Sequence, residues 1–450
     1  MKQQFLILAF LLTVFFINAQ NIIGSWKGEI EFSGQKLTLI FNLTGSPDNL
    51  KATMDSPMQG AKDIPIQKAS FIGKQLNINA ENLGITYLGI LKDNKIYGKF
   101  MQSGLSFDLI LTPFDTKNTS VFNRPQTPKP PFDYPMEEVS FVNPNDKNIL
   151  AGTLILPKDK KNFPIVVLIT GSGKQNRDEE LFGHKPFAVI ADDFAKKGIG
   201  TLRLDDRGVG SSSEGNINDT STNYAEDIGA AVDFLVKKAY KNIGLVGHSE
   251  GGMIAPMVAV KNPNVKFIIS LAGPGVPINE LMYQQNEDIL KQMQLPEDII
   301  KKDLSNKKLM FDYLATYNGK NIKSDFDNFL TIKLSGISEQ EKKAYLELTM
   351  PWMLYFIQYK PSENWSKIKI PVLALNGNLD TQVAAKPNLD AIKTALIKAK
   401  NKNFKTKEIL GANHLFQTAK TGSPNEYSQI EETFSPKVLD IMSEWILNLK

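Results

Sequence analysis

The chain has 450 residues, a formal net charge of +4 and ordinary proportions of apolar and charged residues, so it is large enough for more than one folded domain. Lysines are interspersed with aspartates and glutamates, and no basic stripe with interleaved aromatic residues is present, which argues against nucleic-acid binding. The chain has no cysteine, and this excludes disulfides, thiolate metal sites and a cysteine nucleophile.

The first residues differ from the rest of the chain. Lys2 precedes an apolar run over residues 5–17, and the small residue Ala19 follows it. A charged start, a short apolar core and a small residue at the cut site are the features of a secretory signal peptide. A transmembrane anchor is the alternative, but the run is short for a bilayer span. We expect a signal peptide over residues 1–19, an extracytoplasmic (periplasmic or secreted) protein, and no stable membrane span after its removal.

Residues 20–112 contain short strand patterns separated by turns. Polar and apolar residues alternate over 25–32, 36–43 and 95–101, and glycine, asparagine and aspartate fall between such runs. This pattern predicts a small antiparallel β domain, either a barrel or a sandwich. Its aromatic residues line a binding face or belong to the core, and the core is the more usual place at strand spacing; they include Trp26, Tyr87 and Tyr97.

Six prolines separate this domain from the rest of the chain. Proline breaks regular elements and favours an extended backbone. We therefore expect a linker over residues 113–136, acting as an extended spacer. The prolines are Pro113, Pro125, Pro128, Pro130, Pro131 and Pro135.

From residue 137 to 450, strand and helix patterns alternate. Residues 165–169 form an unbroken apolar run, which is typical of a strand buried on both faces. Strand alternating with helix at this spacing predicts a parallel sheet with crossover helices. A helical, Met- and aromatic-rich block at about 276–366 interrupts the alternation. The other expected strands are 138–142, 150–156, 200–204, 243–246, 265–271, 372–376 and 406–410, and the expected helices are 186–197, 224–238, 252–260, 384–400 and 436–449.

The sequence Gly-His-Ser-Glu-Gly at residues 247–251 follows the apolar run 243–246. A strand that ends in Gly-x-Ser-x-Gly and turns directly into a helix has the form of a nucleophile elbow, which presents the serine hydroxyl on a sharp turn. A Cβ at Gly247 or Gly251 would crowd the strand-to-helix crossing. We therefore predict that Ser249 is a nucleophile, although a glycine-rich turn can produce the same pattern by chance.

An activated serine needs a base and an acid that orients the base. The chain has three histidines, and His414 is the one that follows a strand pattern after Ser249, where functional groups gather in parallel sheets. Asp380 follows the strand 372–376 and lies between Ser249 and His414, as the order Ser, acid, His requires. His248 is expected to leave the turn in another direction, and His184 lies upstream.

An oxyanion site needs two backbone N–H groups. We expect one from Glu250, the residue after the nucleophile, whose side chain could simply face solvent. The other is expected from the small-residue loop after the strand 165–169, from Ser172 or alternatively from Gly173.

A second glycine-containing motif, Asp-Asp-Arg-Gly-Val-Gly-Ser-Ser, occupies residues 205–212. Its glycines could cradle a phosphate. However, no Lys-Ser/Thr follows, and the spacing is not that of a dinucleotide fingerprint. A structural turn that contains an Arg–Asp pair is therefore the favoured interpretation.

Residues 137–450 resemble the α/β-hydrolase superfamily, in particular its serine aminopeptidase-like and bacterial acyl-esterase branch. The resemblance implies an eight-stranded, mostly parallel sheet, a Ser249–Asp380–His414 triad, and a cap inserted after the sixth strand, which agrees with the block at 276–366. Many relatives carry His-Gly at the oxyanion loop where Thr170 and Gly171 stand here, and the N-terminal β domain is not part of the family fold. The matching stretches are residues 171–173, 205–212, 247–251, 377–380 and 411–414.

We therefore expect a serine hydrolase that cleaves small-molecule carboxylic esters through an acyl-enzyme intermediate, without metal or cofactor. In the cap, the apolar stretch 350–356 either lines an acyl pocket or packs on the core. A peptidase acting on short peptides or N-terminal residues is the nearest alternative. It would need a cap carboxylate for the substrate amine, for which Glu280, Glu287, Asp288 and Glu347 are available. A ligand-binding protein with a vestigial hydrolase core is the third possibility, against which the intact candidate triad argues.

Overall fold

The computed structural model divides the chain into two compact units, Met1–Val121 and Phe122–Lys450. It describes residues 22–32, 35–46, 49–57, 61–102, 105–115, 122–158, 161–292, 296–334 and 337–449. The signal peptide expected over residues 1–19 therefore lies outside the described residues. Among the described helices, none is both long enough and apolar enough to cross a membrane.

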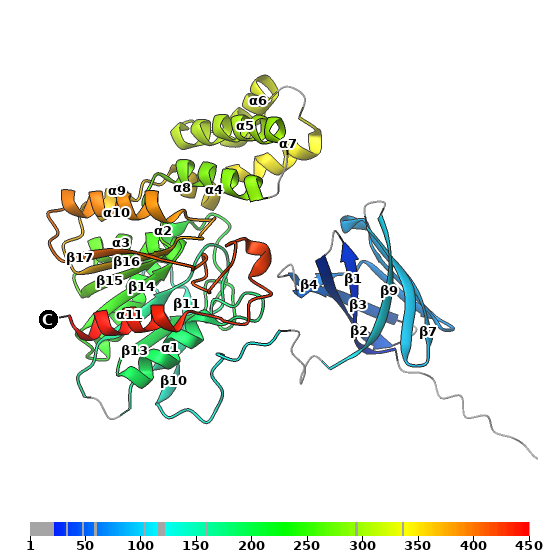
Figure 1. Ribbon diagram of the computed structural model, residues 1–450, viewed down its shortest axis with the longest axis horizontal. Helices are drawn as coiled ribbons and strands as arrows, with labels where there is room; N and C mark the ends of the chain where they lie inside the picture. The colour runs from blue at the N-terminus through cyan, green and yellow to red at the C-terminus, as the bar shows by residue number, and fades with distance from the viewer. Residues whose placement is uncertain are drawn as a thin grey trace, which may run out of the picture. The chain divides into compact units, whose positions relative to one another are not determined.

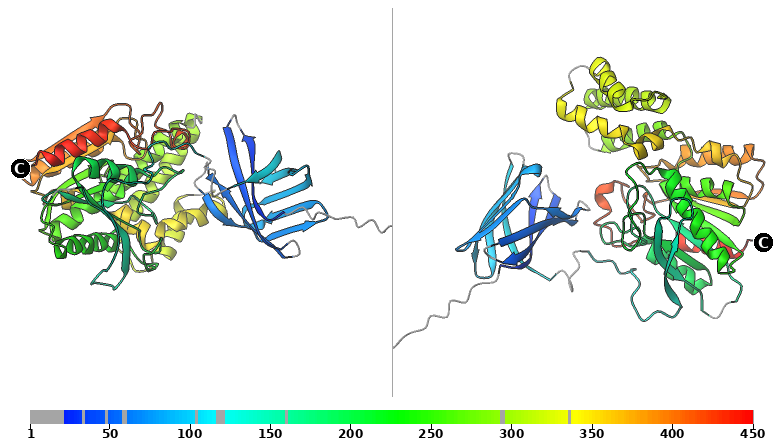
Figure 2. Two further views of the ribbon diagram at one scale, coloured as in Figure 1. Left: turned by 90° about the horizontal axis from the view of Figure 1, so that it is seen from below. Right: turned by 180° about the vertical axis from the view of Figure 1, so that it is seen from behind.

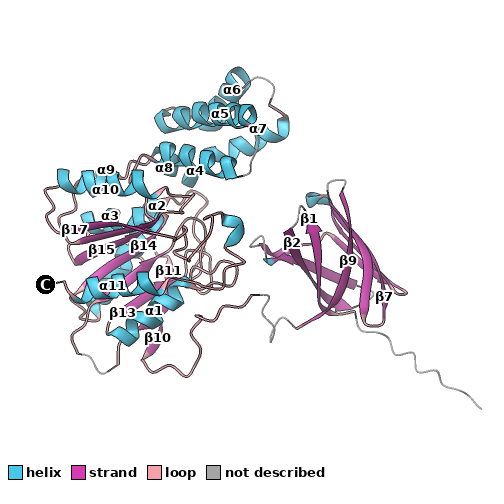
Figure 3. Cartoon of the chain, viewed as in Figure 1, coloured by secondary structure: helices cyan, strands magenta, loops and turns pink. Residues whose placement is uncertain are grey.

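The first unit is a nine-stranded antiparallel sheet (Figure 3), which confirms the expected antiparallel β domain. Neighbouring strands follow the order β4-β3-β2-β1-β9-β8-β7-β6-β5. A short 3-10 helix, η2 (Glu81–Leu83), precedes β7. The strands are β1 (Gly24–Phe32), β2 (Gln35–Ser46), β3 (Asn49–Ser56), β4 (Ala61–Pro65), β5 (Lys68–Ile72), β6 (Gln75–Ala80), β7 (Ile85–Lys92), β8 (Lys95–Gln102) and β9 (Leu105–Phe114).

Alternate residues of these strands fill the interior of the first unit, as the two-residue period of a strand requires. Trp26 and Tyr87 are buried in this core. The Tyr87 hydroxyl lies 3.1 Å from the carbonyl oxygen of Ile96, so its polar end is satisfied there. Tyr97 is 44% exposed and lies on the outer surface. Two of the three aromatic residues noted in the sequence are thus core residues.

Part of the proline-rich stretch is bound to the second unit. Residues 122–135 contain no helix or strand, but the Arg124 guanidinium donates hydrogen bonds to the carbonyl oxygens of Phe182, Ser428 and Ile430 at 2.8–3.2 Å. Gln126 donates to the Phe434 carbonyl at 2.8 Å. These contacts join residues 58 to 308 positions apart, so this stretch is a strap on the second unit and not a free spacer.

The second unit is built on an eight-stranded sheet in the order β10-β11-β13-β12-β14-β15-β16-β17. The pairs β10–β11 and β11–β13 are antiparallel, and all other neighbours are parallel. This arrangement confirms the expected mostly parallel sheet. The strands are β10 (Met136–Val142), β11 (Ile149–Ile155), β12 (Ile165–Ile169), β13 (Gly200–Leu204), β14 (Ile243–His248), β15 (Val265–Leu271), β16 (Val372–Gly377) and β17 (Phe404–Ile409).

Helices cover both faces of this sheet (Figure 1). The side chains of Val166 and Leu168 pack with α1 and α11, whereas those of Val167 and Ile169 pack with α2, α3 and α10. Every residue of β12 is therefore buried, which is the reason for its unbroken apolar run. The helices are α1 (Pro186–Lys197), α2 (Ser221–Lys237), α3 (Glu250–Lys261), α10 (Ala385–Lys398) and α11 (Pro436–Leu447), and the 3-10 helix η4 (Pro424–Glu426) lies before α11.

The expected helical cap is confirmed between β15 and β16, the sixth and seventh strands of this unit (Figure 2). It has an apolar core of its own, to which Phe311, Leu314, Phe326 and Leu330 contribute. The Tyr313 and Phe329 rings stack beside this core with centroids 4.2 Å apart. The cap elements are α4 (Ile278–Gln292), α5 (Glu297–Thr316), α6 (Ile322–Lys333), α7 (Glu339–Leu346), η3 (Glu347–Thr349), α8 (Pro351–Gln358) and α9 (Ser362–Trp365).

Replacing Arg124 with alanine should destabilise the second unit, because three carbonyl groups lose a charged donor. Hydrogen bonds to charged groups contribute about 1.5–3 kcal/mol each, and water replaces part of this at a half-buried site. We expect a loss of about 2 kcal/mol in the free energy of unfolding, measured by chemical denaturation of the full chain. Lys129→Ala, at an exposed position of the same strap, is the control. Equal stability of the two variants would show that the strap contacts contribute nothing.

Candidate active site

Ser249 is the turn residue between the last residue of β14 and the first residue of α3. Ser249 has φ 52° and ψ −120°, a conformation that costs a residue with a Cβ about 1–3 kcal/mol. Its backbone N–H donates to the Leu271 carbonyl at 2.9 Å, which ties the turn to the end of β15. The chain thus holds this serine in a strained conformation of the kind found at functional sites.

The two glycines of the motif are required by close backbone contacts. A Cβ on Gly247 would lie 2.0 Å from the carbonyl oxygen of Gly251, and a Cβ on Gly251 would lie 2.2 Å from the carbonyl oxygen of Ile169. Both distances are far below van der Waals contact, so no other residue fits without moving backbone. The crowding predicted from the sequence is therefore present at both positions.

Asp380 and His414 meet at the carboxyl ends of β16 and β17. The Nδ1 atom of His414 lies 2.8 Å from Oδ2 of Asp380, and both side chains are buried. The other carboxylate oxygen, Oδ1, accepts the backbone N–H groups of Gln382 and Val383, each at 2.8 Å. Because a carboxylate accepts the Nδ1 proton, Nε2 of His414 is left as an acceptor.

His248, the residue before Ser249, lies close to His414. The ring of His248 lies 4.8 Å from the ring of His414, measured between centroids. Among the described residues, no hydrogen bond joins the Ser249 hydroxyl to His414. Such bonds are often long in a site without substrate and shorten when substrate binds. The structure therefore brings the acid and the base into contact, and Ser249 directly follows His248, whose ring lies near that of His414.

The loop after β12 lies directly against the serine. A Cβ on Gly171 would be 3.2 Å from the Cβ of Ser249. In the described part of the chain, the backbone N–H groups of Ser172, Gly173 and Glu250 have no hydrogen-bond acceptor. All three candidate oxyanion donors are thus free to bind a ligand, and both alternatives for the second donor stay open.

The side chain of Glu250 is buried, so the expectation that it faces solvent is wrong. Its Oε1 accepts hydrogen bonds from the Ser221 hydroxyl at 2.6 Å and from the Trp352 Nε1–H at 3.1 Å. Burial raises the pKa of Glu250 above its usual range, although hydrogen bonds from neighbouring side chains oppose the shift. The carboxyl group therefore links α2 to cap helix α8.

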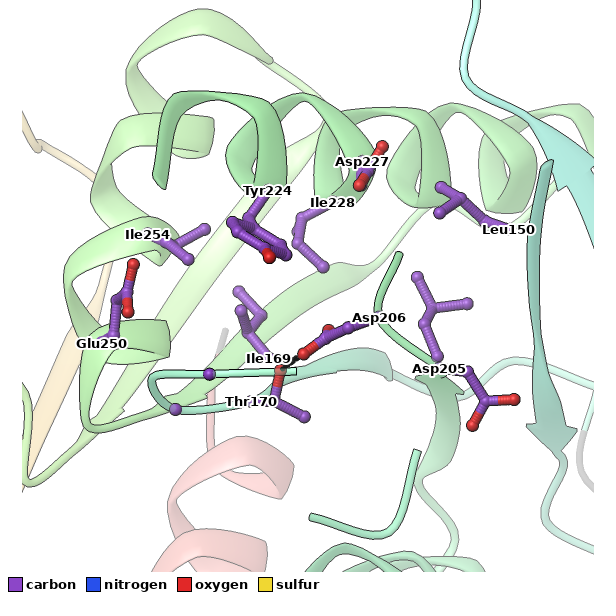
Figure 4. A pocket seen from close by; sticks show the side chains of 13 residues that line it. Leu150, Ile169, Thr170, Asp205, Asp206, Tyr224, Asp227, Ile228, Glu250 and Ile254 are labelled. Carbon is purple, nitrogen blue, oxygen red and sulfur yellow. Dashed lines mark hydrogen bonds between the residues drawn. The ribbon is translucent and has the colours of Figure 1, made fainter. Parts of the chain in front are cut away.

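A cavity of about 30 Å³, lined in part by Thr170, Asp206, Tyr224 and Glu250, lies beside the oxyanion loop (Figure 4). Asp206 accepts hydrogen bonds from the Thr170 hydroxyl at 3.1 Å and from the backbone N–H of Gln175 at 2.9 Å. Burial raises the pKa of Asp206 to about 7 against these bonds, and the charges of other carboxylates add to the shift. Asp206 thus hydrogen-bonds to two residues of the loop after β12, Thr170 and Gln175.

The remaining charges of the 205–212 motif are paired, as the favoured interpretation of a structural turn predicted. Arg207 is buried and contacts carboxylate oxygens of Asp227 and Asp146 at 2.6 Å and of Asp219 at 3.1 Å. Asp205 pairs with Arg177 at 2.6 Å. Because the arginine is fully engaged by carboxylates, it is not available to bind a phosphate.

His184 hydrogen-bonds to residues other than Asp380 and His414. Its Nδ1 lies 2.9 Å from the Thr433 hydroxyl and its Nε2 lies 3.0 Å from the Tyr427 carbonyl. Burial lowers the pKa of His184 to about 4, so the ring is neutral at physiological pH. This histidine therefore holds the loop that follows His414 in place.

The cap stretch 350–356 includes the start of α8. Its residues 351–356 are partly buried, whereas Met350 is exposed. Trp352 stacks on Phe356 at 5.4 Å between ring centroids, and its indole N–H contacts Glu250. Sequence reasoning missed this contact and also missed Glu179, which hydrogen-bonds to both Gly171 and His248. Neither residue carries a local signal, because Trp352 is 102 positions from Glu250 and Glu179 is 69 positions from His248.

Residues 184–417, more than half of the chain, match the family model described as serine aminopeptidase, S33, and the chain belongs to this family of the α/β-hydrolase superfamily. Esterase EstD of Thermotoga maritima is 32% identical over 148 residues, which are 33% of this chain and 35% of EstD. The chain thus matches about a third of the length of this relative. Est1E from Butyrivibrio proteoclasticus shares 17% identity at a TM-score of 0.40, covering 69% of this chain and 97% of that chain. Esterase Pf2001 of Pyrococcus furiosus shares 16% identity at a TM-score of 0.40, covering 70% and 92%.

Gly247→Ala should disrupt the turn, because its Cβ would lie 2.0 Å from a backbone oxygen. We expect a loss of at least about 3 kcal/mol in the free energy of unfolding, the upper end of the cost of overpacking. Gly229→Ala, in α2, meets no atom within 4 Å and should gain about 0.5–1 kcal/mol from helix propensity. Similar unfolding midpoints for both variants in urea would contradict the crowding at the elbow.

The free energy of unfolding should fall as the pH rises from about 4 to about 7, because of the raised pKa of Asp206. Its pKa is raised in the folded state from an ordinary value of about 3.9. Over this window the folded protein keeps a proton that the unfolded chain has released, so stability falls with increasing pH. Asp206→Asn should remove this part of the pH dependence, measured as the unfolding free energy at several pH values. An unchanged slope in the variant would contradict the shift.

Proposed function

We propose that the protein is a serine hydrolase that cleaves carboxylic esters through a covalent acyl-enzyme. The observation that carries the proposal is the buried contact of 2.8 Å between His414 Nδ1 and Asp380, together with the strained backbone of Ser249. An oriented imidazole with an unprotonated Nε2 is a general base for a serine hydroxyl. Membership of a serine hydrolase family and the similarity to the esterase EstD support the same reaction class.

In the first half-reaction, the Oγ atom of Ser249 forms a bond to the ester carbonyl carbon while its proton passes to Nε2 of His414. The carbonyl oxygen becomes an oxyanion, which accepts hydrogen bonds from the backbone N–H groups of Glu250 and of Ser172 or Gly173. When the intermediate collapses, the bond to the alcohol oxygen breaks. His414 then donates its proton to that oxygen, and the alcohol leaves.

In the second half-reaction, a water molecule takes the place of the alcohol. His414 accepts a proton from the water as the water oxygen attacks the acyl carbon, and the oxyanion forms at the same N–H groups. Collapse breaks the bond to Ser249, and the proton returns from His414 to Oγ. Asp380 stays ionised throughout and stabilises the imidazolium that forms in each half.

A second candidate function, release of N-terminal residues from short peptides, is favoured by the description of the family as serine aminopeptidases. Of the four cap carboxylates considered, Asp288 lines a pocket of about 430 Å³ together with Asp380 and Thr381. A carboxylate there would suit a substrate amine. Parallel assays on p-nitrophenyl acyl esters and on aminoacyl-p-nitroanilides separate the two functions, and we expect turnover of the esters.

We further propose that the reaction takes place outside the cytoplasm, because of the signal-peptide pattern over residues 1–19. Microscopy or cell fractionation of the full chain fused to a reporter at its C-terminus tests this location. Recovery of the mature protein in the cytoplasmic fraction would contradict it.

Ser249→Ala and His414→Ala should each lower kcat for a p-nitrophenyl ester by at least about 10³-fold, since triad members act as one unit. Asp380→Asn should lower kcat by about 10⁴-fold, because the amide favours the wrong imidazole tautomer. Circular dichroism should show folded proteins, since these residues occupy a turn and loops. Asp390→Asn, on the exposed side of α10, is the control and should keep wild-type kcat. Activity retained in either alanine variant would remove that residue from the proposed triad.

A further inference from the structure

Two buried ionisable groups next to the triad have no part in the mechanism described above. Glu179 lies in the loop that follows β12, and His248 is the last residue of β14. Both side chains are buried, and Nδ1 of His248 lies 3.0 Å from Oε1 of Glu179. Buried ionisable groups are costly unless they are paired, so this contact needs an explanation.

Both partners of the His248 ring are hydrogen-bond acceptors. Nδ1 faces the Glu179 carboxyl group, and Nε2 lies 2.9 Å from the backbone carbonyl oxygen of His414. A carbonyl oxygen and an ionised carboxylate can only accept. Both ring nitrogens must therefore carry hydrogen when Glu179 is ionised, which makes His248 an imidazolium cation.

The same carboxyl group also holds the oxyanion loop. Oε1 of Glu179 accepts a hydrogen bond from the backbone N–H of Gly171 at 2.6 Å. Gly171 is so near Ser249 that an added Cβ would lie 3.2 Å from the serine Cβ. Glu179 itself has φ 51°, and its backbone N–H donates to the Asn176 carbonyl at 2.8 Å. A left-handed conformation in a residue with a side chain is uncommon, and here it turns the carboxyl group toward Gly171 and His248.

The charged groups around His248 favour its cationic form. Burial alone lowers the pKa of His248, but the charge and hydrogen bond of Glu179, the carbonyl of His414 and the charge of Asp380 together raise it above its ordinary value. These groups come from the loops after β12, β16 and β17, and the Phe416 ring, at 6.5 Å, carries no charge.

We propose that Glu179 and His248 form an ion pair that positions the oxyanion loop and His414 relative to Ser249. Through this pair, three hydrogen bonds connect the N–H of Gly171 to the backbone carbonyl of His414. It rests on the proposed function insofar as His414 is the base and the loop binds the oxyanion. The residue before the nucleophile is thus a positioning residue, which explains why His248 is close to the triad without belonging to it.

The charge state can be measured without any assay of activity. With three histidines in the chain, ring-¹⁵N-labelled histidine gives a small set of long-range ¹H–¹⁵N correlations, which single-site variants assign. At pH 8, above the ordinary histidine pKa of about 6.5, His248 should show two protonated ring nitrogens, and His184 should show one. A His248 ring with one bare nitrogen would overturn the proposal, because Glu179 would then hold the proton and no ion pair would exist.

The positioning role is tested by kcat for a p-nitrophenyl ester. Glu179→Ala removes the acceptor and the charge, and misplaced catalytic groups can cost about 10²-fold in rate, so we expect kcat to fall by about 100-fold with KM nearly unchanged. Glu179→Gln keeps an acceptor oxygen and should restore kcat to within about tenfold of the wild type. Glu180→Gln, an exposed neighbour that pairs with Lys185, should keep wild-type kcat.

The outcomes separate this proposal from the proposed function. Folded Glu179→Ala with wild-type kcat would overturn the positioning role. If Glu179→Ala does not fold, the protonation state of His248 in the wild-type spectrum still confirms or overturns the ion pair. If the wild-type protein hydrolyses no ester, the proposed function fails, and the protonation state of His248 alone confirms or overturns the ion pair.

Discussion

The site depends on one close crossing of backbones at the end of β14. Gly247, Gly251 and the carbonyl of Ile169 approach so closely that a single Cβ would lie about 2 Å from a backbone oxygen. Because the chain must turn in this narrow space, Ser249 takes a positive φ and comes to lie against Gly171 of the loop after β12. The same crossing therefore sets the position of the serine, the start of α3 and the distance to the oxyanion loop.

The parallel sheet supplies the other groups to this point. The carboxyl ends of β12, β14, β16 and β17 lie at one edge of the sheet, and the loops that follow them carry Gly171, Ser249, Asp380 and His414. Loops are more mobile than strands, so hydrogen bonds are needed to hold these groups in fixed positions. Two backbone N–H groups fix the Asp380 carboxylate, and the contacts of Glu179 and His248 join the oxyanion loop to the loop of His414.

Local patterns were enough to predict much of the fold and the candidate triad. The strands 165–169, 200–204 and 265–271 were predicted with the bounds that the structure has, because apolar runs mark strands buried on both faces. Asp380 and His414 could be found because each follows a predicted strand after Ser249, in the chain order Ser, acid, His. The burial of Glu250 could not be predicted, because its partner Trp352 is 102 positions away in the chain. Arg124 likewise looks like an ordinary residue of a proline-rich linker, because its carbonyl partners come from loops distant in sequence.

The central claim is that Ser249 is a nucleophile activated by His414. The most direct measurement is the reaction of the full-length protein with a fluorophosphonate, in which the serine oxygen displaces fluoride from phosphorus, followed by peptide mapping with mass spectrometry. We expect one label per chain, on Ser249 in the wild-type protein, and no label in His414→Ala. A folded wild-type protein that stays unlabelled, or that carries the label on another serine, would contradict it.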